Sequence, residues 1–160
     1  MVQYRLADQA DFPHIVTLLQ DKADLCRTYP AGQYPFSINQ LQQLSRIRKE
    51  LTVMLYNGQI TGFANLYAVQ QGVSAFIGNV IIAAEYRGKG LGRQLVQHMI
   101  QQAQEKYQLQ QVNLSVVNDN TTALLLYSSL GFQPYAIEAQ QHGSAKTTAL
   151  IHMKKTLEQT

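Results

Sequence analysis

One glycine-rich junction constrains this chain more than any other part of its sequence. It reads Arg87-Gly88-Lys89-Gly90-Leu91-Gly92, between an apolar run that predicts a strand over Val73–Ala84 and an amphipathic stretch that predicts a helix over Leu91–Tyr107. A helix N-terminus presents free backbone N–H groups and positive partial charge, and glycines let an anion come close to the backbone. The junction therefore predicts an anion site, and phosphate is the anion that suits it best.

Two well-known phosphate motifs do not fit this junction. A Walker P-loop requires GxxxxGK[ST], which the sequence lacks. A dinucleotide-binding GxGxxG pattern that starts at Gly88 ends on Arg93, and the region near Gln110 lacks the acidic residue that would bind the ribose. The spacing that does fit is Arg-x-x-Gly-x-Gly, with its fixed positions at Arg87, Gly90 and Gly92.

The rest of the chain reads as short strands and helices. Asn57-Gly58 between two β-rich runs predicts a hairpin, because a type I′ turn needs positive φ at both positions. We expect Asp8 to cap a helix that carries Phe12–Leu19, and Ser37 to cap a second helix in a capping box with Gln40. The segment between them, Asp21–Pro35, reads as a loop. The other expected elements are strands over Val2–Leu6, Leu51–Tyr56, Gln59–Val69, Gln111–Val117, Tyr135–Gln141 and Lys146–Met153, and a helix over Asn120–Leu130 that ends at Gly131.

The order of these elements, β-α-α-β-β-β-α-β-α-β-β, predicts an α/β fold. We expect a mixed central sheet of about six to seven strands with helices on both faces. The crossover helix over Leu91–Tyr107 predicts that strands 73–84 and 111–117 are parallel. Because the chain has 160 residues and no recognisable linker, we expect a single domain over residues 1–160.

Composition excludes several classes of protein. The apolar runs are far shorter than the about 20 residues of a membrane span, and no secretory signal is visible, so the cytoplasm is the expected location. The single cysteine, Cys26, cannot form an internal disulfide, and His14, His98 and His152 lack metal-ligand spacing, so no metal is expected. A net charge of +3 suits a small anionic ligand and does not by itself indicate nucleic acid.

The Arg87–Gly92 segment resembles the pyrophosphate loop of the GNAT superfamily of N-acetyltransferases, whose pattern is [Q/R]-x-x-G-x-[G/A]. The run NVIIAAEYRGKGLG looks like that family's coenzyme-binding strand and loop. Downstream, Asn120-x-x-Ala123-x-x-Leu126-Tyr127-x-x-Leu130-Gly131-Phe132 looks like its second signature. The expected order of elements is also the family's order, so the resemblance covers nearly the whole chain and implies the GNAT fold.

The resemblance implies acetyl-CoA as co-substrate and gives site residues to this chain. Tyr127 would be the general acid toward the departing thiolate, and Asn120 would contact the pantetheine arm. The backbone of a bulged strand segment would pair with the same arm, and an amide there would stabilise the developing oxyanion. The implied strand residues are Val80, Ile81 and Ile82, and the implied pyrophosphate residues are Arg87, Gly88, Lys89, Gly90, Leu91 and Gly92. In similar enzymes the next strand, 111–117, diverges to leave a slot.

The sequence departs from the family at the general base. Where relatives carry a glutamate, this chain has Phe76 on the coenzyme strand and Ser115 on the next strand. Neither side chain can act as a carboxylate base. The remaining alternatives are Glu138, His142 and Tyr67, a chain of water molecules or a backbone carbonyl, and the sequence does not choose among them.

The expected activity is acetyl transfer to a primary amine by direct attack in a ternary complex. The amine would be a small molecule, an amino acid or a peptide N-terminus, with Arg27, Tyr29, Tyr34 and Phe36 as candidate substrate contacts and His142 as a weaker one. Few acids in that region argue against a polyamine. Two alternatives stay open, another acyl-CoA donor and a coenzyme-binding sensor or partner protein without turnover. We expect no nucleic acid and no membrane as partners, and a homodimer is an open alternative.

Overall fold

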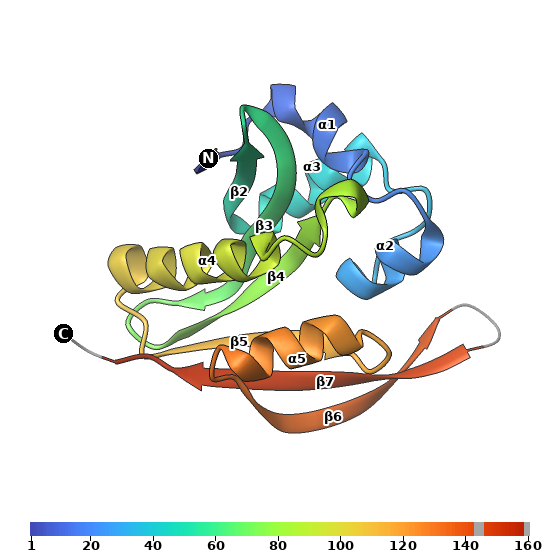
Figure 1. The fold of residues 1–160 in the computed structure, drawn as a ribbon. Coiled ribbons are helices and arrows are strands. Elements are labelled where there is room, and N and C mark those ends of the chain that lie inside the picture. Colours follow the sequence, from blue (N-terminus) through green and yellow to red (C-terminus); the bar gives the residue numbers. More distant parts are fainter. Residues whose placement is uncertain (143–145, 159–160) are drawn as a thin grey trace. The chain divides into compact units, whose positions relative to one another are not determined.

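The computed structural model describes residues 1–142 and 146–158. In these residues the elements follow the order β1 (Val2–Leu6), η1 (Gln9–Asp11), α1 (Phe12–Val16), α2 (Lys22–Thr28), α3 (Ile38–Ile47), β2 (Lys49–Tyr56), β3 (Gln59–Gln70), β4 (Ser74–Ile82), η2 (Ala84–Tyr86), α4 (Leu91–Tyr107), β5 (Gln111–Val117), α5 (Thr121–Ser129), β6 (Gln133–His142) and β7 (Lys146–Thr156). Figure 1 labels these elements on the ribbon.

The described strands form one mixed seven-stranded sheet in the order β1-β2-β3-β4-β5-β7-β6. β4 and β5 are parallel, whereas β1 and β2, β2 and β3, β5 and β7, and β6 and β7 are antiparallel. The α/β fold with a mixed sheet of six to seven strands is therefore confirmed, and so is the parallel pair on either side of α4.

The chain divides into two compact units. The first unit comprises Met1–Tyr67 and Ile77–Met99, and the second comprises Ala68–Phe76 and Ile100–Thr160. The single domain over residues 1–160 stays a prediction.

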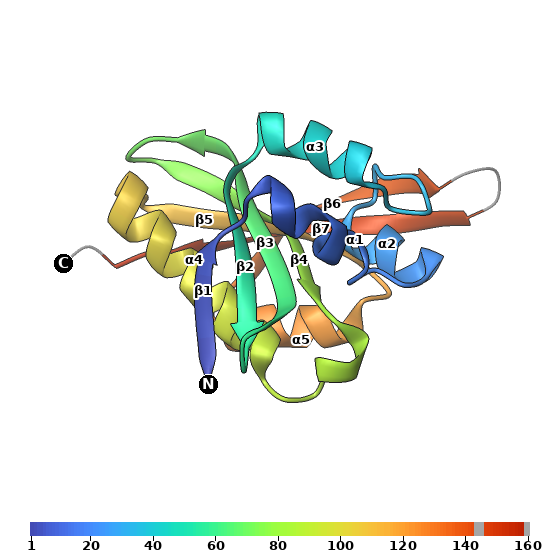
Figure 2. The same ribbon diagram turned by 90° about the horizontal axis from the view of Figure 1, so that it is seen from above.

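In the first unit, the α1 to α3 region packs on β2, β3 and the end of β4. Figure 2 shows strands β1 to β4 side by side in the view from above. Their shared core holds apolar side chains that are at most 8% exposed, namely Phe12, Ile15, Leu18, Leu19, Leu25, Phe36, Leu41, Leu44, Val53, Phe63, Ile81 and Ala83. The hairpin at Asn57-Gly58 is confirmed, with φ of 52° and 82°.

Two local expectations in the first unit were wrong in part. The segment 21–35 contains helix α2, because Asp21 caps it by accepting from the Asp24 N–H at 2.7 Å. The residues that suggested a loop all follow Thr28. The helix expected over Phe12–Leu19 ends at Val16, although Leu18 and Leu19 are buried.

The capping box expected at the start of α3 is only half present. Ser37 accepts from the Gln40 N–H at 3.2 Å. The Gln40 amide turns back instead to the preceding loop, where it accepts from the Gln33 N–H and donates to the Gln33 carbonyl, both at 2.9 Å. Gln40 thus fixes the loop before the helix rather than the N-cap backbone.

In the second unit, β5, β7 and β6 run side by side, with α5 between β5 and β6 in the chain (Figure 1). β7 pairs with β5 along all of Gln111–Val117, whereas β4 pairs with β5 only from Ser74↔Gln111 to Phe76↔Asn113. Asn120 is the N-cap of α5, and Gly131 lies past its end with φ of 96°, as expected. Residues 143–145, which connect β6 and β7, lie outside the described residues.

Candidate active site

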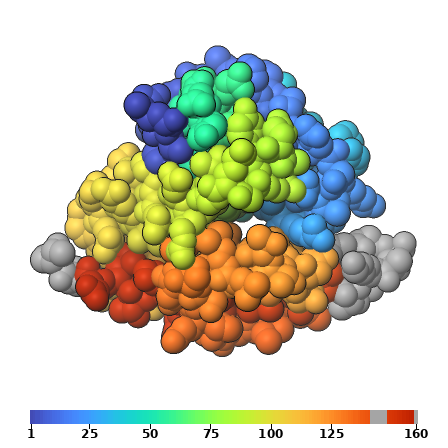
Figure 3. All heavy atoms as spheres, viewed as in Figure 1, coloured from blue at the N-terminus to red at the C-terminus, as the bar shows by residue number. Residues whose placement is uncertain are grey.

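The glycine-rich loop lies in the first unit, between η2 and α4. Arg87, Gly88, Lys89 and Gly90 are all exposed, and atoms of this part of the chain (yellow-green) are at the surface in Figure 3. Gly88 and Gly90 have φ of 79° and 76°, in the left-handed region that glycine adopts at low cost. The Gln94 N–H donates to the Gly90 carbonyl at 3.3 Å, so Gly90 accepts at the very start of the 17-residue helix α4.

This loop fits an anionic phosphate group. A Cβ built on Gly88 or Gly90 would meet no atom within 4 Å, so the space beside both residues is open and their backbone conformation, not packing, requires glycine. The first N–H groups of a helix have no partners within the helix. Leu91 is buried and anchors the first turn, while Gly92 beside it is half-buried.

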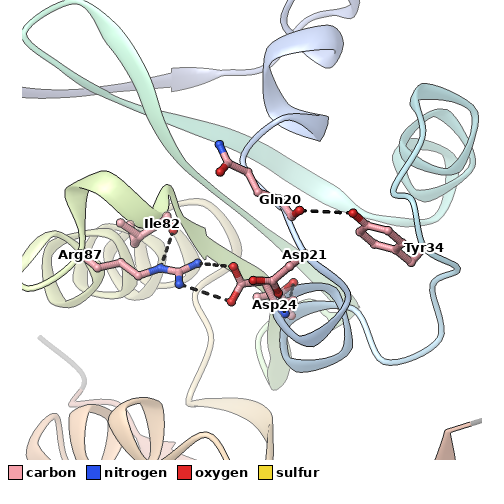
Figure 4. Close-up of polar contacts among 7 residues, drawn as sticks. Gln20, Asp21, Asp24, Tyr34, Ile82 and Arg87 are labelled. Carbon is pink, nitrogen blue, oxygen red and sulfur yellow. Dashed lines mark hydrogen bonds and ion pairs between the residues drawn. The ribbon is translucent and has the colours of Figure 1, made fainter.

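The side chain of Arg87 turns away from the loop toward α2. Its Nε donates to the Ile82 carbonyl at 3.0 Å, and its two terminal nitrogens donate to the Asp24 carboxylate at 3.3 and 3.1 Å (Figure 4). The Asp24 side chain is only 12% exposed. Sequence reasoning missed Asp24, since the pair is 63 residues apart and no local pattern connects them.

Strand β4 has an irregular backbone just before the expected bulge. Asn79 has φ of 51°, and its side chain accepts from the Asn65 amide at 2.8 Å and donates to the Thr28 carbonyl at 2.9 Å. These bonds hold a conformation that is uncommon for a residue other than glycine. Of the implied pantetheine residues, Ile81 is 2% exposed, while Val80 and Ile82 are half-buried.

Asn120 and Tyr127 lie in the second unit. Asn120 is the N-cap of α5, and Tyr127 lies within the helix. The Asn120 carboxamide accepts from the Ala123 N–H at 3.3 Å, which satisfies one free donor of the helix. Atoms of α5 (orange) form part of the exposed surface in Figure 3. Asn120 and Tyr127 thus belong to the same helix, as the sequence predicts.

Tyr127 is the most deeply buried titratable group assigned to the site. Its side chain is 7% exposed, and its ring meets the Phe132 ring edge-on at 5.9 Å between centroids. Burial raises the pKa of Tyr127 to about 12. The phenol is therefore protonated throughout the neutral range, as a hydrogen-bond donor must be.

The residues considered as the general base fall into separate environments. Tyr67 lies under the Arg48 guanidinium at 3.8 Å. Glu138 is 62% exposed and contacts His152 Nε2 at 3.1 Å. Phe76 is half-buried, and the side chain of His142 lies outside the described part of the structure.

Ser115 has a partner that sequence reasoning did not assign. Its Oγ lies 2.7 Å from His152 Nδ1, because the register of β5 and β7 places the two residues opposite each other. Sequence reasoning considers His152 only as a metal ligand, for which it lacks the spacing. The signal that could have found it is the alignment of two antiparallel strands, which a single sequence does not provide.

The four main candidate substrate contacts belong to the first unit. Tyr34 is 49% exposed and donates to the Gln20 carbonyl at 3.3 Å (Figure 4). Tyr29 is half-buried and meets Phe36 edge-on at 6.0 Å. Phe36 itself is 8% exposed in the core, so its contacts here are those of packing. Arg27 is exposed on α2.

The described residues show neither of two features that are typical of other protein classes. Among the described residues, no three His, Cys, Asp or Glu side chains gather closely enough to bind a metal ion. None of the helices in the described ranges combines the length and the hydropathy that a bilayer span requires.

Comparisons with known proteins point to one family. The profile of the acetyltransferase (GNAT) family matches residues 16–132, which include both the glycine-rich loop and Tyr127. The spermine/spermidine N(1)-acetyltransferase of Bacillus subtilis is 30% identical over 87 residues, 50% of this chain and 57% of that protein. The ribosomal-protein alanine N-acetyltransferase of Escherichia coli is 29% identical over 109 residues, 68% of each chain.

A solved structure agrees with these sequence matches. The GCN5-related N-acetyltransferase of Kribbella flavida superposes with a TM-score of 0.79 at 28% identity and covers 98% of both chains. The match to the Bacillus subtilis enzyme spans little more than half of its length. The family profile, in contrast, covers most of this chain and both of its signature segments, and the chain therefore belongs to the GNAT family of acetyltransferases.

Proposed function

We propose that this chain transfers an acetyl group from acetyl-CoA to a primary amine. The observation that carries the proposal is the pair of signature segments within the family match, each with suitable geometry. Gly88 and Gly90 adopt left-handed backbone conformations in the loop before α4, and Tyr127 is a buried neutral phenol. Enzymes of this family are acetyl-CoA-dependent acyltransferases, and acetyl-CoA supplies an activated acetyl thioester.

The proposed roles follow from what each group can donate or accept. The backbone N–H groups of Arg87–Gly92 bind the pyrophosphate, and the exposed Lys89 adds positive charge. Backbone groups of Val80–Ile82 and the Asn120 side chain bind the pantetheine arm. The Tyr127 hydroxyl donates a hydrogen bond, and finally a proton, to the leaving thiol sulfur. Arg87 fastens the loop to α2 through Asp24.

For the acceptor we propose a small amine or a peptide N-terminus. One relative is named for the alanine of a ribosomal protein, and the other is named for spermine and spermidine. A polyamine site needs carboxylates that are free to bind ammonium groups. Asp24, which is buried beside the candidate substrate segment, already forms an ion pair with Arg87. The aromatic side chains of Tyr29 and Tyr34 suit an uncharged or peptide-like acceptor better.

A panel assay tests this function. Thiol release from acetyl-CoA is measured with benzylamine, alanine amide, an alanine-initiated peptide and spermidine as acceptors. We expect turnover with at least one of the first three and less with spermidine. Propionyl-CoA in place of acetyl-CoA tests the donor. Coenzyme binding without thiol release from any donor would favour the alternative of a non-catalytic coenzyme-binding protein.

Two further assignments are proposals of the same kind. We propose a cytoplasmic location. We also keep a homodimer as an alternative, because β6 is an edge strand of the sheet and its Ile137 is 70% exposed. Light scattering of the purified protein gives its mass in solution and decides between monomer and dimer.

A further inference from the structure

Three polar side chains form a continuous hydrogen-bonded chain across β5, β7 and β6. Ser115 Oγ lies 2.7 Å from His152 Nδ1, and His152 Nε2 lies 3.1 Å from Glu138 Oε1. The pairing registers Ser115↔His152 and Ala136↔His152 place the three residues on adjacent strands. All three lie within the second unit, which also contains Tyr127.

The partners of His152 determine the direction of both hydrogen bonds. A carboxylate can only accept, so the Nε2 that faces Glu138 carries a hydrogen and donates to it. In the neutral imidazole, Nδ1 is then the acceptor, and the Ser115 hydroxyl donates to it. Ser115 therefore points its proton at a nitrogen that is free to take it.

The exposure of the three side chains to solvent differs along the chain of hydrogen bonds. Ser115 is half-buried, and its neighbours Leu114 and Val116, which point to the opposite face of β5, are only 2% exposed. The His152 side chain is 20% exposed and the Glu138 side chain 62%. The chain thus runs from a sheltered hydroxyl to a carboxylate in solvent, which is the arrangement of a proton exit path.

Other charged and titratable groups near His152 come from β6 and β7. The centroid of the Tyr135 ring lies 6.1 Å from that of the imidazole. The Lys154 ammonium lies 5.5 Å from the centroid of the Tyr135 ring. Glu138 contacts the imidazole directly, so a positive charge on His152 is neutralised at its own hydrogen-bonding partner.

We propose that Ser115, His152 and Glu138 form the proton relay that deprotonates the acceptor amine. This inference rests on the proposed function and supplies the general base that the sequence leaves unassigned. Ser115 is the catalytic residue that contacts the ammonium group, His152 is the base behind it, and Glu138 is a positioning residue that holds the imidazole in the required tautomer.

The proton balance of the transfer requires an acceptor for one proton besides the coenzyme thiol. An alkylammonium nitrogen loses two protons when it becomes an amide. One of them ends on the coenzyme thiol, and Tyr127 can deliver it. For the other, an ammonium N–H gives its proton to Ser115 Oγ as the Ser115 proton moves to His152 Nδ1, which leaves the lone pair on nitrogen. The Nε2 proton then passes by Glu138 to water.

A pair of acceptors separates this role from a structural one. Benzylamine is an ammonium ion at neutral pH, whereas aniline is already neutral and needs no base before attack. We expect His152→Gln and Ser115→Ala to lower kcat with benzylamine about 10²-fold or more, and kcat with aniline less than threefold. Ser115→Thr, which keeps the hydroxyl, should restore most of the activity, and Lys154→Gln on the same strand is the control.

The relay also has a readout that requires no acceptor. Nitrogen-15 NMR of the imidazole should show the hydrogen of neutral His152 on Nε2. Glu138→Gln and Ser115→Ala should both shift the His152 nitrogen resonances. A hydrogen on Nδ1, or resonances that neither variant moves, would overturn the proposal.

Two kinetic outcomes would also overturn it. Equal losses with benzylamine and aniline would mean that the three residues only support the fold. An acetyl group found on Ser115 by mass spectrometry after incubation with acetyl-CoA alone would make Ser115 a nucleophile. If the wild-type protein releases no thiol with any amine, the proposed function fails, whereas the NMR result still tells whether the relay exists.

Discussion

Tyr127 combines deep burial with a single hydroxyl group, so the proposed acid can be removed without emptying the site of its ring. Tyr127→Phe keeps the ring against Phe132 and removes only the oxygen. We expect kcat to fall by about 10²- to 10⁴-fold, the usual contribution of a positioned acid. The acetyl-CoA dissociation constant should stay within about twofold, because the proposed role of the phenol is to protonate the leaving sulfur and not to bind the coenzyme. Steady-state kinetics and calorimetric titration measure the two quantities.

The pH profile of the wild-type enzyme checks the same residue. Because the pKa of Tyr127 is raised to about 12, the phenol loses its proton only above the pH range in which an ordinary tyrosine titrates. Tyr127 should therefore add no alkaline decline in kcat near pH ~10, where a free phenol titrates. Tyr4→Phe, at a half-buried tyrosine of β1, is the control. A Tyr127-dependent decline centred near pH ~10 would contradict the assignment.

The left-handed glycines of the loop allow a matched comparison with a third glycine. Gly88, Gly90 and Gly72 have φ of 79°, 76° and 75°, and a Cβ on any of them would meet nothing within 4 Å. Alanine should therefore cost each position a similar backbone strain of about 1–2 kcal/mol. We expect similar losses in thermal stability for Gly88→Ala, Gly90→Ala and Gly72→Ala.

Coenzyme affinity should separate these three variants. Gly72 lies in the turn between β3 and β4, so Gly72→Ala should bind acetyl-CoA like the wild type. The two loop variants should bind it at least about tenfold more weakly, since their backbone N–H groups are displaced. Equal affinities in all three would remove the loop from the coenzyme site. Calorimetric titration with acetyl-CoA makes the comparison.

At the scale of the elements, the Arg87–Asp24 ion pair connects α2 with the loop before α4. Asp24→Asn removes the charge that neutralises Arg87 while it keeps the size of the side chain. We expect tighter binding of acetyl-CoA, a polyanion, at low salt and a smaller gain at higher salt, because exposed charges are screened. The Arg87 side chain is 45% exposed, so the thermal stability should change little.

A second acid near the same loop provides the control for Asp24→Asn. Glu85 is exposed in η2, two residues before Arg87. Glu85→Gln removes the same formal charge without releasing the Arg87 guanidinium. If both variants change the affinity equally, the effect is one of net charge and not of the ion pair.

Elements with strong local signals were predictable, and those that depend on competing signals were not. The bounds of β1, α4 and β5 match the expected ranges, since each is a clean apolar pattern between clear breaks. Helix α2 was missed because its seven residues, Lys22–Thr28, mix polar and apolar side chains in a short segment, and two prolines and a glycine follow within the same stretch. Its Asp21 cap was a signal that could have been used.

At the scale of the whole chain, the contacts on which the proposed site depends join residues far apart in sequence. Ser115 and His152 are 37 residues apart, and Asp24 and Arg87 are 63 apart. The motif residues were predictable because the loop and α5 are local patterns. Their partners were not, because strand register and helix placement are set by the packing of the core and not by neighbouring residues.

Acetyl-CoA should stabilise the folded protein as a whole, and this is the first measurement to make. A ligand at about 100 times its dissociation constant adds ~2.7 kcal/mol. For a chain of 160 residues that is a rise in melting temperature of roughly 5–10 °C. Because the proposal assigns coenzyme contacts to residues of both units, adenosine phosphates, which lack the pantetheine arm, should raise it less. A melt unchanged at millimolar acetyl-CoA would leave the glycine-rich loop as a turn without a ligand.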